Sequence, residues 1–153
     1  MTLPPRSRAE RIADTQALLE SEVDTWVATA DPDSAKPCLV PLSYFWDGEM
    51  LLLSTPGDGP TGRGLRSGPG ARLGLGLTRN VVLIDATVET IALDDLAASE
   101  ADAFAARAGF DPRQSDPGYF WFRARPHRIL AWREENELAN RTIMRNGSWL
   151  EGD

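Results

Sequence analysis

The spacing of apolar residues divides the chain into two helical segments and a series of short strands. Residues 6–21 carry apolar side chains at helical spacing, with charged side chains on the other faces, and Ser7 with Glu10 resembles a capping box. Residues 94–108 are alanine-rich and predict a second, inserted helix. Runs typical of strands lie at residues 23–29, 39–46, 50–54, 72–77, 81–93, 119–124 and 127–133.

Turn signals between these runs predict antiparallel pairing. The Asp-Gly pair at residues 47–48 is a strong hairpin signal, residues 78–80 form a second expected turn, and Pro126 indicates an edge, bulge or bend. About six strands joined by tight turns, with flanking helices, predict a mainly β protein built on an antiparallel barrel. No linker interrupts the sequence, so we expect a single domain over residues 1–153. Its tail, residues 136–153, is expected to contain a helical turn and a short strand.

Composition excludes several classes of protein. The net charge of −7 disfavours a general nucleic-acid binder. No apolar run approaches the roughly 18–20 residues that span a bilayer, and the first residues lack a signal-peptide core, so we expect a cytoplasmic protein without a membrane partner. Cys38 is the only cysteine and favours a small buried side chain over a reactive thiol. The only histidine, His127, favours a solvent-facing strand residue, so neither a catalytic residue nor a metal site is predicted.

The most informative segment follows the third expected strand. Ser54 and Thr55 end that strand, and a loop rich in glycine and proline then carries Thr61 and Arg63. Hydroxyls, free amides and guanidinium groups together suit a phosphate. Residues 57–62 match the letters of a dinucleotide fingerprint, but that fingerprint needs a parallel strand–helix–strand unit, which the tight turns argue against. A flexible surface loop with at most a short helical turn is the competing interpretation.

The order of these features resembles that of the flavin-binding split-barrel proteins, the pyridoxamine 5′-phosphate oxidase-like superfamily. The resemblance covers most of residues 6–133 and includes the family's hydroxyl-x-Arg-Asn-Leu turn, in which Gly64 replaces the asparagine. The matching pieces are the leading helix and the segments PCLVPLSY at 37–44, LLST at 52–55, PTGRGL at 60–65, RLGL at 72–75 and VVLIDATVE at 81–89.

The resemblance implies a six-stranded split barrel of the FMN-binding type that forms a homodimer with two cofactor sites at its interface. The cofactor ring would lie near the strand at residues 40–42, and the phosphate would be held by the hydroxyl and arginine side chains around the glycine-rich loop. The implied cofactor-binding residues are Val40, Pro41, Leu42, Leu53, Ser54, Thr55, Thr61, Gly62 and Arg63.

The function implied is a flavin-dependent oxidoreductase that transfers hydride between its bound cofactor and an unidentified small molecule. FMN is the expected cofactor. The alternative is the deazaflavin coenzyme F-420, whose anionic tail would suit a basic groove lined by Arg66, Arg72 and Arg79. Residues 141–150 do not resemble the substrate-binding tail of true pyridoxamine phosphate oxidases, so vitamin B6 oxidation is not expected. A non-catalytic flavin- or haem-binding protein for storage, sensing or regulation remains open.

Overall fold

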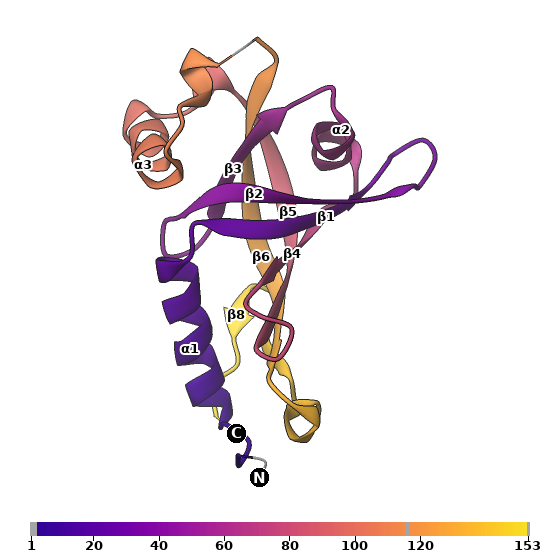
Figure 1. Ribbon diagram of the computed structural model, residues 1–153, viewed down its shortest axis with the longest axis vertical. Helices are drawn as coiled ribbons and strands as arrows, with labels where there is room; N and C mark the ends of the chain where they lie inside the picture. The colour runs from indigo at the N-terminus through magenta and orange to yellow at the C-terminus, as the bar shows by residue number, and fades with distance from the viewer. Residues whose placement is uncertain (1–2, 116, 153) are drawn as a thin grey trace.

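The computed structural model describes residues 3–115 and 117–152, so the ends of the expected domain and of its tail lie outside the described residues. Its helices and strands follow one another along the chain as shown in Figure 1. They are α1 (Arg8–Ser21), β1 (Asp24–Ala30), β2 (Pro37–Trp46), β3 (Leu51–Pro56), α2 (Pro60–Ser67), β4 (Ala71–Leu75), β5 (Val81–Ala92), η1 (Leu93–Asp95), α3 (Ala98–Ala108), η2 (Pro112–Gln114), β6 (Tyr119–Trp132), η3 (Glu135–Glu137), β7 (Thr142–Arg145) and β8 (Ser148–Trp149).

Six of the strands form a closed antiparallel barrel in the order β3-β2-β1-β4-β5-β6, and β3 pairs with β6 to close it. The expected antiparallel pairs β2–β3 and β4–β5 are both present. The barrel with flanking helices predicted from the sequence is therefore confirmed. β7 and β8 continue the sheet from β6 as a small hairpin outside the barrel.

The interior of the barrel is filled by alternate residues of its strands, because successive side chains of a strand point to opposite faces. The side chains with no exposed area include Val27, Leu53, Leu73, Ile84 and Ile129. A second apolar cluster lies between the barrel and α3, where the rings of Phe104 and Trp121 meet edge to face at 5.1 Å. α3 is therefore fixed to the outside of the barrel, at the upper left in Figure 1.

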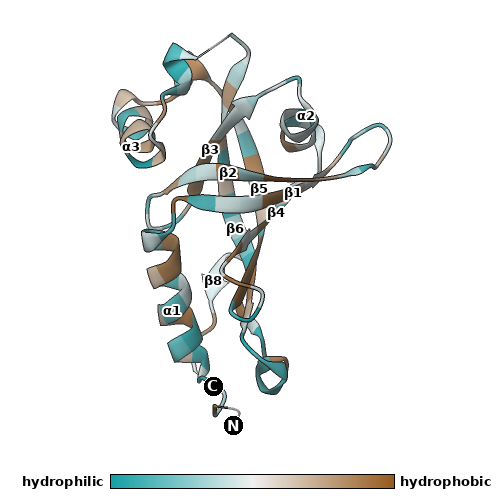
Figure 2. Ribbon diagram, in the orientation of Figure 1, coloured by the Kyte–Doolittle hydropathy of each residue, from teal (hydrophilic) through white to brown (hydrophobic). Residues whose placement is uncertain are grey.

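The two long helices begin later than the spacing of their apolar residues predicts, and for α1 the capping box already indicates the later start. The capping box of Ser7 and Glu10 is present, so α1 begins at Arg8 rather than at residue 6. α1 lies beside β6 and β7, and Figure 2 shows hydrophilic and hydrophobic bands alternating along it. α3 begins at Ala98 because residues 93–95 form a separate 3₁₀ turn and Leu96 is extended and buried in the second cluster.

In the last third of the chain, the structure confirms the bulge that Pro126 indicates, joins the two strands predicted on either side of it, and adds a strand that was not predicted. β6 is one continuous strand, and Pro126 lies at a bulge where the register against β5 shifts and His127 is the extra residue. The tail contains the expected turn and short strand, but also β7, which the sequence analysis missed. The signal was present as Asn146-Gly147, whose positive φ angles of 52° and 77° are those of a two-residue hairpin turn.

Candidate cofactor site

The glycine-rich loop contains a helix, α2, where the sequence predicts at most a short turn. Pro60 occupies the first helical position, which suits its fixed φ. A Cβ atom on Gly62 would collide with the carbonyl oxygen of Pro56, and one on Gly64 would lie 2.7 Å from the Cβ of Thr29. The two glycines therefore let α2 pack directly against the end of β3 and against β1, and this packing outweighs their low helix propensity.

The first turn of α2 leaves two backbone N–H groups without a partner in the helix. Its N-cap is Gly59, which offers no side-chain hydrogen bond, and the first hydrogen bond of the helix runs from Arg63 N to Gly59 O at 2.9 Å. The N–H groups of Thr61 and Gly62 precede that bond and have no carbonyl partner within the helix. These donors and the helix dipole favour negative charge at this end.

The hydroxyls of the site lie on different faces of β3. Ser54 Oγ donates to Phe120 O at 2.8 Å, on the face opposite to the fully buried Leu53. Thr55 alternates with Ser54, is 9% exposed, and its hydroxyl has no hydrogen-bond partner among the described residues. Ser54 and Thr55 therefore cannot bind one phosphate together through their side chains, and Thr55 is the hydroxyl that is left to bind one.

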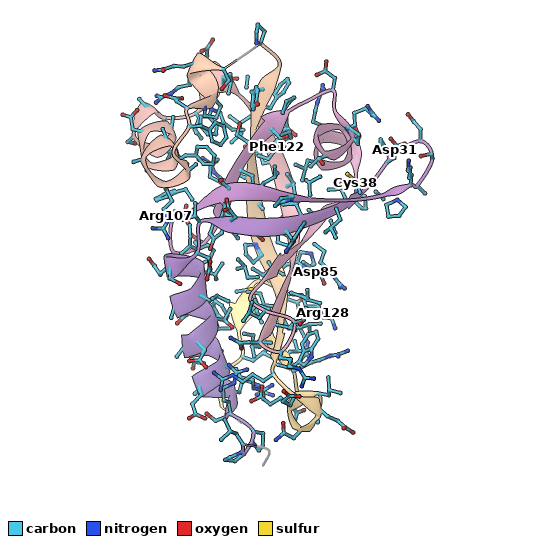
Figure 3. All side chains as sticks on the ribbon, in the orientation of Figure 1. Asp31, Cys38, Asp85, Arg107, Phe122 and Arg128 are labelled. Carbon is cyan, nitrogen blue, oxygen red and sulfur yellow. The ribbon has the colours of Figure 1, made fainter. Side chains whose placement is uncertain are left out.

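Thr61 faces the barrel from the first turn of α2. It is 7% exposed, and its Oγ1 lies 3.4 Å from Cys38 Sγ on β2. Figure 3 shows Cys38 beside α2. Cys38 is half-buried rather than buried, so the sequence-based interpretation of a small core residue holds only in part.

Arg63 is paired with a carboxylate that the sequence analysis did not connect with the site. Its guanidinium donates to Asp58 O at 2.8 Å and to Asp31 Oδ2 at 3.2 Å, so it bridges the start of α2 and the β1–β2 hairpin. The backbone N–H of Ser34 and then the Arg63 guanidinium lower the pKa of Asp31 to about 2. Asp31 is therefore ionised at neutral pH. A contact across 32 positions leaves no local signal in the sequence.

The residues expected near the cofactor ring are divided between two faces of β2. Val40 and Leu42 are partly buried and pack against the barrel core, whereas Pro41 is exposed and lies opposite Trp26 of β1. Of the three, Pro41 alone presents its side chain on the outer face.

The outer face around Pro41 is unusually apolar for a surface. Trp26, Leu39 and Leu77 are 52%, 62% and 80% exposed, and together with Gly74 and other residues of β4 and β5 they line a groove of about 310 Å³. We call this surface the outer apolar face. Exposed apolar surface of this kind marks sites of contact with ligands or other protein chains.

The basic groove expected for a deazaflavin tail does not form. The three arginines have different partners: Arg66 lies over the Phe120 ring, Arg72 forms two hydrogen bonds with Asp85, and Arg79 pairs with Glu134. Each guanidinium is held in a different part of the barrel. Arg72 and Arg79 are each already paired with a protein carboxylate, so an anionic tail would meet a partly neutralised guanidinium at either residue.

Few of the described residues around this site could act as an acid, a base or a metal ligand. His127 is exposed at the bulge of β6, as the sequence predicts. Among residues 3–115 and 117–152, no group of three or more His, Cys, Asp or Glu side chains could hold a metal ion. In the same residues, no helix is long and apolar enough to cross a membrane.

Comparison with known proteins rests on structure, because no family model and no curated protein matches the chain. An F420 reductase is 17% identical with a TM-score of 0.61, covering 74% of this chain and 94% of its own. A protein of the pyridoxinephosphate oxidase family from Clostridium acetobutylicum is 14% identical with a TM-score of 0.58, and the match covers 84% of this chain and 92% of that protein. A haem storage protein from Vibrio cholerae is 11% identical with a TM-score of 0.61, and the match covers 79% of this chain and 94% of that protein. The chain therefore has the split-barrel fold of the pyridoxamine 5′-phosphate oxidase-like proteins.

Proposed function

We propose that this protein is a flavin- or deazaflavin-dependent oxidoreductase that holds the cofactor phosphate at the first turn of α2. The observation that carries the proposal is the first turn itself, where the N–H groups of Thr61 and Gly62 have no partner within the helix and the Arg63 guanidinium is bonded to Asp58 O just before it. FMN and coenzyme F-420 both present a phosphate on a sugar-alcohol chain, so both fit these donors. The F420 reductase among the similar structures supports the deazaflavin alternative.

The residues of this chain would bind and orient the cofactor. The N–H groups of Thr61 and Gly62 and the Thr55 hydroxyl would donate to the phosphate oxygens, and Arg63 would supply positive charge. The outer apolar face near Pro41 would cover a planar ring and exclude water from it. Hydride transfer is the chemistry that a bound flavin or deazaflavin supplies, so a site without a positioned acid or base is compatible with this class of reaction.

The proposal is tested by cofactor binding and turnover. The purified protein is titrated with FMN and with F-420 while flavin fluorescence is recorded, and NADPH or reduced F-420 is then supplied with a range of acceptors. Binding at micromolar concentration followed by acceptor-dependent oxidation supports the proposal. Binding without turnover, or a haem absorption band on addition of haemin, would instead favour the non-catalytic alternative, which the similarity to a haem storage protein keeps in view. No binding of any of them would reject both.

We expect Arg63→Ala to weaken FMN binding by about 1.5 kcal/mol, roughly tenfold, because one charge-assisted hydrogen bond to the phosphate is lost. Binding of riboflavin, which has no phosphate, should not change. The matched control is Arg125→Ala, which removes an exposed guanidinium paired with Glu49 far from α2. Equal weakening of FMN and riboflavin by Arg63→Ala would show that Arg63 supports the fold of the site rather than the phosphate.

We also propose that the protein forms a homodimer through the outer apolar face, since burial of Trp26, Leu39 and Leu77 against a second copy would remove this surface from water. Trp26→Glu is expected to shift the protein from dimer to monomer in analytical ultracentrifugation, because it places a charge in the middle of that contact. Leu138→Glu, at a residue 43% exposed on another part of the surface, should leave the dimer intact. A wild-type monomer at high micromolar concentration would refute the dimer.

A further inference from the structure

The carboxylate of Asp31 lies against the arginine that the phosphate would need. Its Oδ2 accepts from Arg63 Nη2 at 3.2 Å. Its Oδ1 accepts from the backbone N–H groups of Asp33 and Ser34 and from Ser34 Oγ, at 3.0, 2.9 and 3.1 Å. The hairpin turn therefore holds Asp31 in place independently of Arg63, and any anion bound by Arg63 would share it with this carboxylate. Figure 3 shows Asp31 in the β1–β2 hairpin beside α2.

The other charges around the first turn of α2 nearly cancel. Asp58 precedes the N-cap and adds a second carboxylate, while the Arg66 guanidinium is bonded to Gly57 O at 3.3 Å. Lys36, at the end of the hairpin that holds Asp31, is the third cation of this region. Asp33 in the same hairpin is a third carboxylate, so three cations and three carboxylates leave no net positive charge to meet a ligand.

The charge of a phosphate depends on how it is esterified. A phosphomonoester such as that of FMN has a second pKa of about 6 and is close to a dianion above pH 7. A phosphate esterified on both sides, as in the deazaflavin coenzyme, keeps a single charge. Because Coulomb energy is proportional to charge, the Asp31 carboxylate repels the dianion about twice as strongly, in free energy, as it repels the monoanion. The cations attract the dianion twice as strongly as well, so where the charges cancel no electrostatic gain is left to offset the larger free-energy cost of removing the dianion from water.

We propose that Asp31 is a specificity-determining residue that makes the site prefer a singly charged phosphodiester over the doubly charged phosphomonoester of FMN. This inference rests on the proposed function and names the cofactor class within it: a flavin or deazaflavin whose phosphate is a diester. Asp31 acts through the charge that it places beside Arg63 and the ligand. The preference for FMN expected from the sequence is thereby reversed.

The test compares three ligands that share one ring: riboflavin, FMN, and the methyl ester of FMN, which carries a singly charged phosphodiester. Dissociation constants are measured by fluorescence at pH 8 and low salt, where FMN is a dianion. The wild-type protein should bind the methyl ester more tightly than FMN. Asp31→Asn keeps an oxygen that accepts the bonds of the turn. The Asp31→Asn variant should bind FMN about fivefold and the methyl ester about twofold more tightly than the wild type, with the affinity for riboflavin unchanged.

The matched control is Asp33→Asn, which removes the same charge from the same turn but does not touch Arg63. If the wild type binds FMN more tightly than the methyl ester, or if Asp33→Asn changes the ratio of the two affinities as much as Asp31→Asn does, the inference is overturned while flavin binding stands. If none of the three ligands binds the folded wild-type protein, the proposed function itself fails. If Asp31→Asn does not fold, the affinities of the wild-type protein for FMN and for its methyl ester still decide whether the site prefers the phosphodiester.

Discussion

Gly62→Ala is expected to destabilise the protein by about 3 kcal/mol and to abolish tight flavin binding. A Cβ atom at this position would overlap the carbonyl oxygen of Pro56 and lie 2.8 Å from the Cα of Gly57, so it meets backbone atoms that cannot rotate away. Alanine would gain about 1 kcal/mol of helix propensity, but overpacking against a fixed backbone exceeds that gain. α2 would have to move off the barrel, and the first turn that we assign to the phosphate would move with it.

The control for this prediction is Gly59→Ala, three positions earlier. A Cβ atom on Gly59 would have no neighbour within 4 Å, and the residue has an ordinary φ of −73°. Its loss of stability should stay below about 1 kcal/mol, the scale of a poorer N-cap. Urea denaturation followed by tryptophan fluorescence measures both variants. Equal stability of the two would show that α2 is not packed against Pro56 as described.

The fold was predictable because its signals are local. Alternating apolar runs and tight turns such as residues 47–48 determine antiparallel neighbours, and six such strands close into a barrel. The missed strand β7 carried an equally local signal at residues 146–147 that was not used. The helix α2, for which the sequence indicates only a short turn, was underestimated for a different reason. Glycine lowers helix propensity wherever it occurs, and only the tertiary structure shows that Gly62 and Gly64 are the residues that let this helix approach the barrel.

The candidate site was predictable only in outline. The segment was identified from its residue types, but two features of the structure rearrange it. Strand alternation separates Ser54 from Thr55, a consequence that the sequence already contained. The pairing of Arg63 with Asp31 joins two turns that are distant in the sequence, and no periodicity or composition reports such a contact. The number of positive charges available to a ligand is therefore a property of the folded structure.

Glu137→Gln is expected to destabilise the protein by about 3 kcal/mol at pH 7, because it removes one member of a buried ion pair. Glu137 is 3% exposed and accepts four hydrogen bonds: from the backbone N–H, Nε and Nη2 of Arg6, and from the backbone N–H of Arg133. It thereby ties the segment before α1 to the end of β6. Glu134→Gln is the control, since its exposed pairing with Arg79 should contribute less than about 1 kcal/mol.

The same carboxylate predicts a pH dependence of stability. The hydrogen bond from the Arg6 side chain, with the backbone donors, lowers the pKa of Glu137 from 4.5 to about 2. Since the pKa is lower in the folded protein, the unfolded chain binds the proton first as the pH falls. The stabilisation is therefore complete above about pH 5.5 and is lost progressively between pH 4.5 and 2. The difference in unfolding free energy between wild type and Glu137→Gln, measured by urea denaturation, should shrink over that interval. A difference that stays constant from pH 7 to pH 3 would mean that Glu137 contributes through packing rather than through its charge.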